Sequence, residues 1–351
     1  MQDKIISLTS KERVELRQTV VHNLPAQLTP LIGREQDVAE VCALLSRPEV
    51  RLVTLTGTGG VGKTRLALEV AASLREAFAD GVCYVPLAAI RDPGLLLSTL
   101  AQQLELRPGR EPVLLEHLSL ALHEKHLLVL LDNFEQLLEA APQLVDLLRA
   151  CPHLKLLVTS RAVLHVQGEY EYSVMPLALP DQQRLDDLQA LSQCASVMLF
   201  VQRVQTRVLG FSLTLTNARP VAEICLRLDG LPLALELAAA RSKLLPPQAL
   251  LERLFQRLAL LTSPALDVPA RQQTLRNTLN WSYDLLNAGE QKFFRRLAVF
   301  VGGCQLQAVE AVCTQLPGDE DPRPHEASPS VLDTMGSLID KSLVQQSEVE
   351  G

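Results

Sequence analysis

Residues 57–64 read Gly-Thr-Gly-Gly-Val-Gly-Lys-Thr and match the pattern G-x-x-x-x-G-K-[ST] at every fixed position. The motif follows an apolar, β-branched segment at 51–57 and precedes a stretch with helical periodicity at 63–78. Glycines let backbone N–H groups turn toward a phosphate, and the start of the helix adds the positive end of its dipole. The sequence therefore predicts a phosphate-binding loop between a strand and a helix, which requires an α/β domain.

This loop predicts the ligand as well as the fold. Lys63 supplies a cation for the β- and γ-phosphates, and Thr64 supplies a hydroxyl ligand for Mg²⁺. We therefore expect ATP or ADP with Mg²⁺. The predicted nucleotide contacts in this segment are Gly57, Thr58, Gly59, Gly60, Val61, Gly62, Lys63, Thr64 and the adjacent Arg65.

A carboxylate at the end of a second apolar strand supports this interpretation. Asp132 ends the segment 127–132, where a carboxylate can hold Mg²⁺ directly or through water. An isolated Asp at that place is usually a helix cap, but the phosphate loop favours the metal role. Asn133 follows, and an amide cannot take a proton from an attacking water. Glu135 is a candidate general base, although it is equally well explained as an acid in the first turn of a helix.

Apolar strands alternate with helical segments from 36 to 180, as in a parallel sheet covered on both faces by helices. The predicted strands are 51–57, 81–88, 127–132, 155–161 and 170–177, and the predicted helices between them are 63–78, 93–106 and 135–151. Later predicted helices are 193–209, 217–228, 232–243, 247–260 and 330–346, the last ending in a strand, with a short helix at 9–20 before the first domain.

These patterns divide the chain into four parts. An N-terminal helix and linker (1–22) precede the nucleotide-binding domain (23–180), which is followed by an all-helical domain (181–262) and a last domain (263–351). The prolines near 263–272 mark the final boundary.

Composition excludes several classes of protein. The net charge of −7 disfavours a general nucleic-acid or anionic-membrane binder. Apolar runs are far shorter than the roughly 18 residues of a membrane span, and no signal peptide precedes them. The seven cysteines show no Cys-x-x-Cys spacing, which indicates reduced thiols and no zinc site. We expect a cytoplasmic protein that does not bind membranes.

The phosphate loop has companions in a characteristic order. Leu-Ile-Gly-Arg-Glu at 31–35 precedes it, and Lys-Leu-Leu-Val-Thr-Ser-Arg at 155–161, Gly-Leu-Pro-Leu-Ala-Leu at 230–235 and Trp-Ser-Tyr-Asp-Leu-Leu at 281–286 follow. This set resembles the NB-ARC module of STAND ATPases, the signal-transduction ATPases with numerous domains. It is most similar to the bacterial modules found inside large LuxR-like and AfsR-like regulators.

The resemblance implies an α/β P-loop NTPase domain with a parallel sheet, then a helical domain and a winged-helix domain. It implies that Leu31, Ile32, Gly33 and Arg34 line the adenine and ribose side of the site. Arg161 would sense the γ-phosphate, and Pro232 with its neighbour Leu233 would pack on the adenine. Arg161 is also explained as a surface residue after a strand, and Pro232 as the first residue of a helix.

Three departures from this resemblance bear on function. Asn133 replaces the usual second acid, so hydrolysis would be slow or absent. We find no counterpart of the family's terminal MHD-like motif before Gly351, so the winged-helix domain is expected to be incomplete. Sensor repeats and an effector domain are expected to lie outside this sequence.

The motifs leave three functions open. The first is a switch that is closed and monomeric with ADP and opens and oligomerises with ATP. The second is a conventional turnover ATPase. The third is DNA binding through the winged helix, which the 7 Lys and Arg against 12 Asp and Glu in 263–351 disfavour. The activating signal, the effector output and the oligomer number are not encoded in these motifs.

Overall fold

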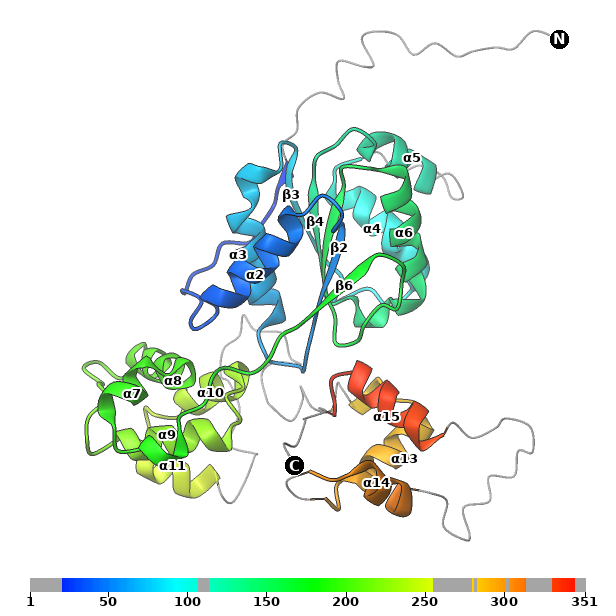
Figure 1. The fold of residues 1–351 in the computed structure, drawn as a ribbon. Helices are drawn as coiled ribbons and strands as arrows, with labels where there is room; N and C mark the ends of the chain where they lie inside the picture. Colours follow the sequence, from blue (N-terminus) through cyan, green and yellow to red (C-terminus); the bar gives the residue numbers. More distant parts are fainter. Residues whose placement is uncertain are drawn as a thin grey trace, which may run out of the picture.

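The fold is described here from a computed structural model, which places residues 21–106, 114–254, 280, 283–300, 303–313 and 330–344 (Figure 1). Its centre is a six-stranded parallel sheet with the strand order β1-β3-β4-β5-β2-β6. The strands are β1 (Val21–His22), β2 (Leu52–Thr56), β3 (Gly81–Pro86), β4 (Leu128–Asp132), β5 (Lys155–Thr159) and β6 (Glu169–Ser173).

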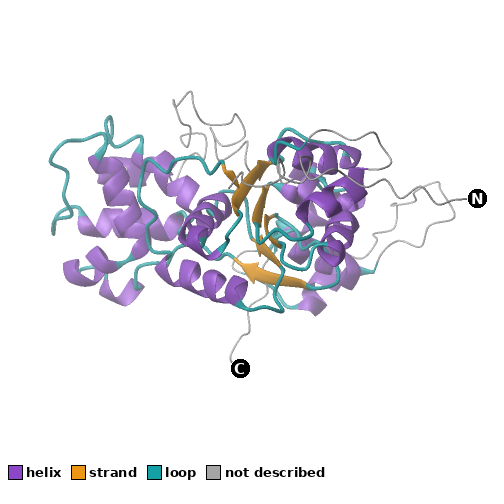
Figure 2. Ribbon diagram, turned by 90° about the horizontal axis from the view of Figure 1, so that it is seen from above, coloured by secondary structure: helices purple, strands orange, loops and turns teal. Residues whose placement is uncertain are grey.

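Helices cover both faces of this sheet (Figure 2). On one face α2 (Glu35–Ser46) and α3 (Lys63–Ser73) pack on one core. On the other face α4 (Leu96–Gln103), α5 (Leu114–Leu122) and α6 (Ala141–Ala150) enclose a second core. Every residue of β2, β4 and β5 is buried. This burial explains why these strands are apolar or β-branched, without alternation, at every position except Asp132 and Lys155 at strand ends.

Helices follow the sheet and surround a separate core. They are α7 (Leu188–Gln193), α8 (Ala195–Gln205), α9 (Ala218–Arg227), α10 (Pro232–Ala239) and α11 (Pro247–Leu254). Their apolar faces, with Phe200 fully buried at the centre, form this third core. The predicted P-loop domain with a parallel sheet and a helix-rich remainder is therefore confirmed.

Three further helices form a small cluster near the end of the chain. They are α13 (Ala288–Leu297), α14 (Leu306–Cys313) and α15 (Val331–Asp340), packed around Phe293 and Leu338. Capping boxes begin two of them, at Asn287 with Glu290 and at Ser330 with Asp333. Among the described helices, none has the length and apolar character needed to cross a bilayer.

Several predicted elements have different bounds in the structure. The helix expected at 135–151 is two short 3-10 turns, Phe134–Gln136 and Leu138–Ala140, followed by α6 with Pro142 in its first turn. Proline has no N–H to donate within a helix, so it favours this starting position. The stretch 93–106 likewise begins with a 3-10 turn at Pro93–Leu95. The end of the helix expected at 63–78 is also different, because α3 stops at Ser73 and Arg75–Ala77 form a separate 3-10 turn. The helix expected at 9–20 lies outside the described residues.

Candidate nucleotide-binding site

The phosphate loop spans the gap between β2 and α3. Gly57, Gly60 and Gly62 have φ angles of +137°, +86° and +102°, in a region that side-chain-bearing residues rarely adopt. A methyl group on Gly57 would lie 2.7 Å from the carbonyl oxygen of Val174. A methyl group on Gly62, the residue before α3, would meet nothing within 4 Å. The loop is thus tightly held on the β6 side and open at the helix start, which fits the approach of a phosphate.

Lys63 is half-buried and lies over its own loop. Its Nζ donates hydrogen bonds to the carbonyl oxygens of Gly57, at 2.6 Å, and Thr58, at 3.1 Å. Burial lowers the pKa of Lys63 to about 8, while Glu135 and Asp132 act to raise this pKa and Arg161 acts to lower it. Three of the charged residues that the sequence nominated therefore act electrostatically on this amine.

Asp132 lies at the end of β4 and faces the start of α3. Its Oδ1 accepts hydrogen bonds from the hydroxyls of Thr64, at 2.7 Å, and Thr159, at 2.6 Å. Its Oδ2 accepts from Tyr84, at 3.3 Å, and from the Asn133 amide, at 3.0 Å. A carboxylate oxygen beside a threonine hydroxyl is a donor set suited to a hard cation, so Thr64 and Asp132 fit Mg²⁺.

Asn133 has a left-handed backbone, with φ 65° and ψ 56°. Asn is one of the few non-glycine residues that adopt this conformation readily. Its N–H donates to Oγ1 of Thr159 at 3.0 Å, and its side chain donates to Asp132. These two hydrogen bonds connect the residue after β4 to the end of β5 and orient the Asp132 carboxylate.

Glu135 forms an ion pair with Arg161. The distance from Arg161 Nε to Glu135 Oε1 is 3.3 Å, and the two side chains are only 10 % and 4 % exposed. Glu135 sits in the 3-10 turn after β4, and Arg161 follows β5. The two residues named as candidate base and candidate phosphate sensor thus contact each other.

The segment 31–34 lies at the junction of two cores. Leu31 packs against the core under α2 and α3, whereas Ile32 packs against the core of the helices α8–α11. Gly33 has φ +64°, and a methyl group there would lie 2.3 Å from Cβ of Ala195 at the start of α8. This segment therefore joins the sheet to the helical part.

Two arginines named as candidate contacts are directed at backbone carbonyls. Arg34 is buried and donates to the oxygens of Val61, at 3.1 Å, and Met175, at 2.6 Å. Arg65 donates to the carbonyl oxygen of Thr29 at 2.6 Å and to that residue's hydroxyl at 2.8 Å. Both guanidinium groups hold chain segments around the loop in this arrangement.

Leu233, the residue after Pro232, lies against the phosphate loop. Pro232 is the first residue of α10, as expected of proline at a helix start. The N–H of Leu233 donates to the carbonyl oxygen of Gly60 at 3.1 Å. A methyl group on Gly60 would lie 2.9 Å from Cβ of Leu233. The helical part therefore contacts the loop directly.

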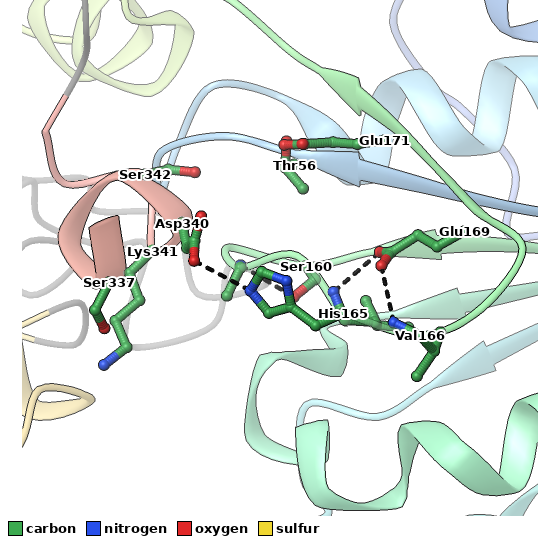
Figure 3. Close-up of polar contacts among 12 residues, drawn as sticks. Thr56, Ser160, His165, Val166, Glu169, Glu171, Ser337, Asp340, Lys341 and Ser342 are labelled. Atoms are coloured by element: carbon green, nitrogen blue, oxygen red, sulfur yellow. Dashed lines mark hydrogen bonds and ion pairs between the residues drawn. The ribbon is translucent and has the colours of Figure 1, made fainter. Parts of the chain in front are cut away.

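The end of α15 contacts the segment that follows Arg161 (Figure 3). Ser342 donates to the carbonyl oxygen of Arg161 at 2.8 Å, and His165 Nε2 lies 3.1 Å from Asp340 Oδ2. Glu169 accepts backbone hydrogen bonds from Leu164, at 2.9 Å, and Val166, at 3.5 Å, which shapes this segment.

Sequence reasoning missed Thr159 and Tyr84, which both bond to Asp132. Thr159 could have been found, because it lies two residues before Arg161 at the end of a strand beside β4. The carboxyl ends of neighbouring parallel strands meet at one edge of a sheet. Tyr84 gave no such signal, since it lies within β3 rather than at its end.

A family model described as "AAA domain" matches residues 49–164, which contain both the phosphate loop and Asp132. The "Putative HTH-type transcriptional regulator Rv0890c" of Mycobacterium tuberculosis is 41% identical over 304 residues, covering 86% of this chain and 32% of that protein. The chain thus spans about a third of the length of that regulator.

Two further relatives are similar over most of the chain. "Uncharacterized protein Rv0894" of Mycobacterium tuberculosis is 35% identical over 329 residues, covering 93% of this chain and 78% of that protein. "Regulatory protein AfsR" of Streptomyces coelicolor is 26% identical over 346 residues, covering 92% of this chain and 31% of that protein. The expected similarity to AfsR-like regulators is therefore confirmed.

Proposed function

The chain belongs to the same family as the Mycobacterium tuberculosis protein Rv0894, and we propose that it is a nucleotide-dependent regulatory switch. It binds ADP or ATP with Mg²⁺ between the sheet domain (23–180) and the helical domain (181–262). ADP holds these domains together in the resting state, and exchange for ATP opens them. Hydrolysis is slow or absent. The NB-ARC module of STAND ATPases is the type of switch we assign.

The observation that carries this proposal is the contact between α10 and the phosphate loop. Leu233 donates a hydrogen bond to Gly60, and a methyl group on Gly60 would lie 2.9 Å from Cβ of Leu233, so α10 lies directly against the loop. A nucleotide shifts an equilibrium between two arrangements only through its different affinity for each. A ligand held by the loop and by Pro232 together gains affinity when the domains are closed.

The described residues fit the ligand in distinct roles. The loop glycines, Lys63 and Arg161 would hold the phosphates, and Leu31, Ile32 and Gly33 would lie beside the base. Thr64 and Asp132 would hold Mg²⁺, which neutralises phosphate charge when bound. Arg34 and Arg65 support the site by fixing the segments that surround the loop.

Slow turnover is supported by the residue that follows Asp132. Asn133 directs its amide to Asp132 and offers no second acid. A conventional ATPase would need a carboxylate facing an attacking water.

The regulatory context comes from the longer relatives, which are named as regulators. We propose that this module passes its nucleotide state to sensor and effector domains of such a protein. It is a monomer with ADP and assembles with further copies when activated. The cluster α13–α15 is assigned to a winged-helix domain with a regulatory role and without nucleic-acid binding.

Identification of the co-purified nucleotide tests this function. The chain is purified without added nucleotide, denatured in acid, and the released small molecules are separated by chromatography. Near-stoichiometric ADP is expected. Release of ATP alone would contradict a resting ADP state, and an empty protein that hydrolyses added ATP at about 1 s⁻¹ or faster would favour a conventional ATPase.

A further inference from the structure

The ion pair between Glu135 and Arg161 has a consequence for how the site distinguishes nucleotides. Both side chains are nearly inaccessible to water, and their charged atoms are 3.3 Å apart. Buried opposite charges at this distance interact strongly, and separating them needs a replacement partner for each. The pair lies close to the proposed metal ligands, because Glu135 follows Asp132 by three residues and Asp132 accepts a hydrogen bond from Thr64 of the phosphate loop.

We propose that Glu135 is a specificity-determining residue that holds Arg161 when no γ-phosphate is present, and that a γ-phosphate competes with Glu135 for the same guanidinium group. This inference rests on the proposed nucleotide site and adds how it separates tri- from diphosphates. A diphosphate leaves the pair intact. A triphosphate gains Arg161 only by breaking the pair, so its affinity is lowered by the energy of that exchange.

The positions of the two residues favour exchange rather than a fixed structural bridge. Arg161 and Glu135 follow the neighbouring parallel strands β5 and β4. They therefore lie at the carboxyl ends of the strands, where the phosphate loop also begins after β2. Guanidinium groups bind carboxylates and phosphates with the same planar donor geometry. A phosphate oxygen can therefore replace the Glu135 carboxylate without a change in the donor.

Arg161 also contacts the C-terminal helices through its backbone. The carbonyl oxygen of Arg161 accepts the hydrogen bond from Ser342, so the backbone that carries the guanidinium group is attached to the end of α15.

The test is a double-mutant cycle on nucleotide preference. Dissociation constants for Mg²⁺-ADP and for the non-hydrolysable Mg²⁺-AMP-PNP are measured by calorimetry for the native chain, Glu135→Gln, Arg161→Met and the double variant. In Glu135→Gln the preference for AMP-PNP over ADP should rise about tenfold, which is a typical factor by which one interaction changes the affinity for a ligand. The ratio of the two constants isolates the γ-phosphate, since general changes in charge affect both ligands.

The Arg161→Met background separates exchange from simple repulsion. If Glu135 acts through Arg161, adding Glu135→Gln there should change the ratio by less than about twofold. An equal rise in both backgrounds would overturn the proposal, because Glu135 would then repel the phosphate directly. An unchanged ratio in Glu135→Gln alone would overturn it too.

A matched control is available in Glu290→Gln. The side chain of Glu290 is buried like that of Glu135, with 8 % exposed against 4 %, and it pairs with Lys341 within the C-terminal helices. Its substitution should leave the ratio unchanged. If Glu135→Gln fails to fold, Glu135→Asp keeps the charge but shortens its reach, and should raise the ratio in the same direction by less. If the native chain binds neither nucleotide, the proposed function itself is contradicted.

Discussion

Substitution of Gly33 by Ala tests whether the close contact between the 31–34 segment and α8 holds the two domains together. Gly33 is outside the phosphate loop, so the change alters the junction and leaves the phosphate contacts in place. Its φ of +64° is left-handed, and the added methyl group would lie 2.3 Å from Cβ of Ala195. Real carbon atoms of this kind do not approach so closely, so one of the two segments must move.

The expected cost has two separable parts. The left-handed backbone costs a non-glycine residue about 1 kcal/mol, and overpacking adds about 1–3 kcal/mol, which together give a loss of about 2–4 kcal/mol. The overpacking cost depends on the Ala195 side chain. If Ala195 is replaced by Gly, the nearest remaining atoms are 3.4 Å and 3.7 Å away, which are ordinary contact distances.

The assay is urea unfolding followed by far-UV circular dichroism, together with retention of bound nucleotide, for Gly33→Ala, Ala195→Gly and the double variant. The steric part should appear as a favourable coupling of about 1–3 kcal/mol in the double variant, with nucleotide retention recovering in parallel. If the effects of the two substitutions add to within about 0.5 kcal/mol, the contact between Gly33 and Ala195 is contradicted.

Three more predictions follow from the site. Burial lowers the pKa of Lys63 to about 8, and bound phosphates favour the charged form of this amine. Nucleotide affinity should therefore fall about tenfold per pH unit above about 8, with proton uptake on binding. Calorimetry at about pH 9 in buffers of different ionisation enthalpy measures this uptake, and finding none would contradict the prediction. Asp132→Asn should keep the fold, since the amide oxygen can still accept from Thr64 and Thr159, but should reduce the enhancement of nucleotide binding by Mg²⁺ by roughly tenfold. A variant that responds to Mg²⁺ like the native chain would exclude Asp132 as a ligand. Ser342→Ala should speed hydrogen exchange of the amides at 160–166 by about fivefold, the effect of losing about 1 kcal/mol of hydrogen bonding; unchanged exchange would mean that α15 does not restrain this segment.

The centre of the sheet could be predicted from sequence because β2, β4 and β5 are fully buried. The continuous apolar runs at 127–132 and 155–161 leave little choice of structure, and the observed strands Leu128–Asp132 and Lys155–Thr159 lie within them. The phosphate loop was equally predictable, since its pattern is short, local and flanked by the right elements. Its three glycines with positive φ are required by the backbone path.

Other parts of the fold were missed because their signals are weak or nonlocal. The strand β1 has only two residues and is defined by its pairing with β3. The helix α5 buries Leu114, Leu118 and Leu122 at helical spacing, but the stretch is so rich in Leu that the period is hard to see.

The contacts that define the candidate site are nonlocal too. Gly60 and Leu233 meet across two cores, and the partner of Glu135 follows a different strand. Sequence patterns nominated all four of these residues or their neighbours, yet no pattern states which side chains face each other. Arg34 and Arg65 illustrate the same limit, because a guanidinium group beside a phosphate loop can equally bond to carbonyl oxygens.

Leu31 and Ile32 are consecutive residues anchored in different cores, and Leu231 packs against both of these cores. A rigid-body rotation of the helical part must therefore pivot close to the line joining these two places. Points near a pivot move little, whereas distant points travel far, as along a lever. In such a rotation, a small adjustment at the loop contact of α10 would become a larger displacement at α11, without any element having to unfold.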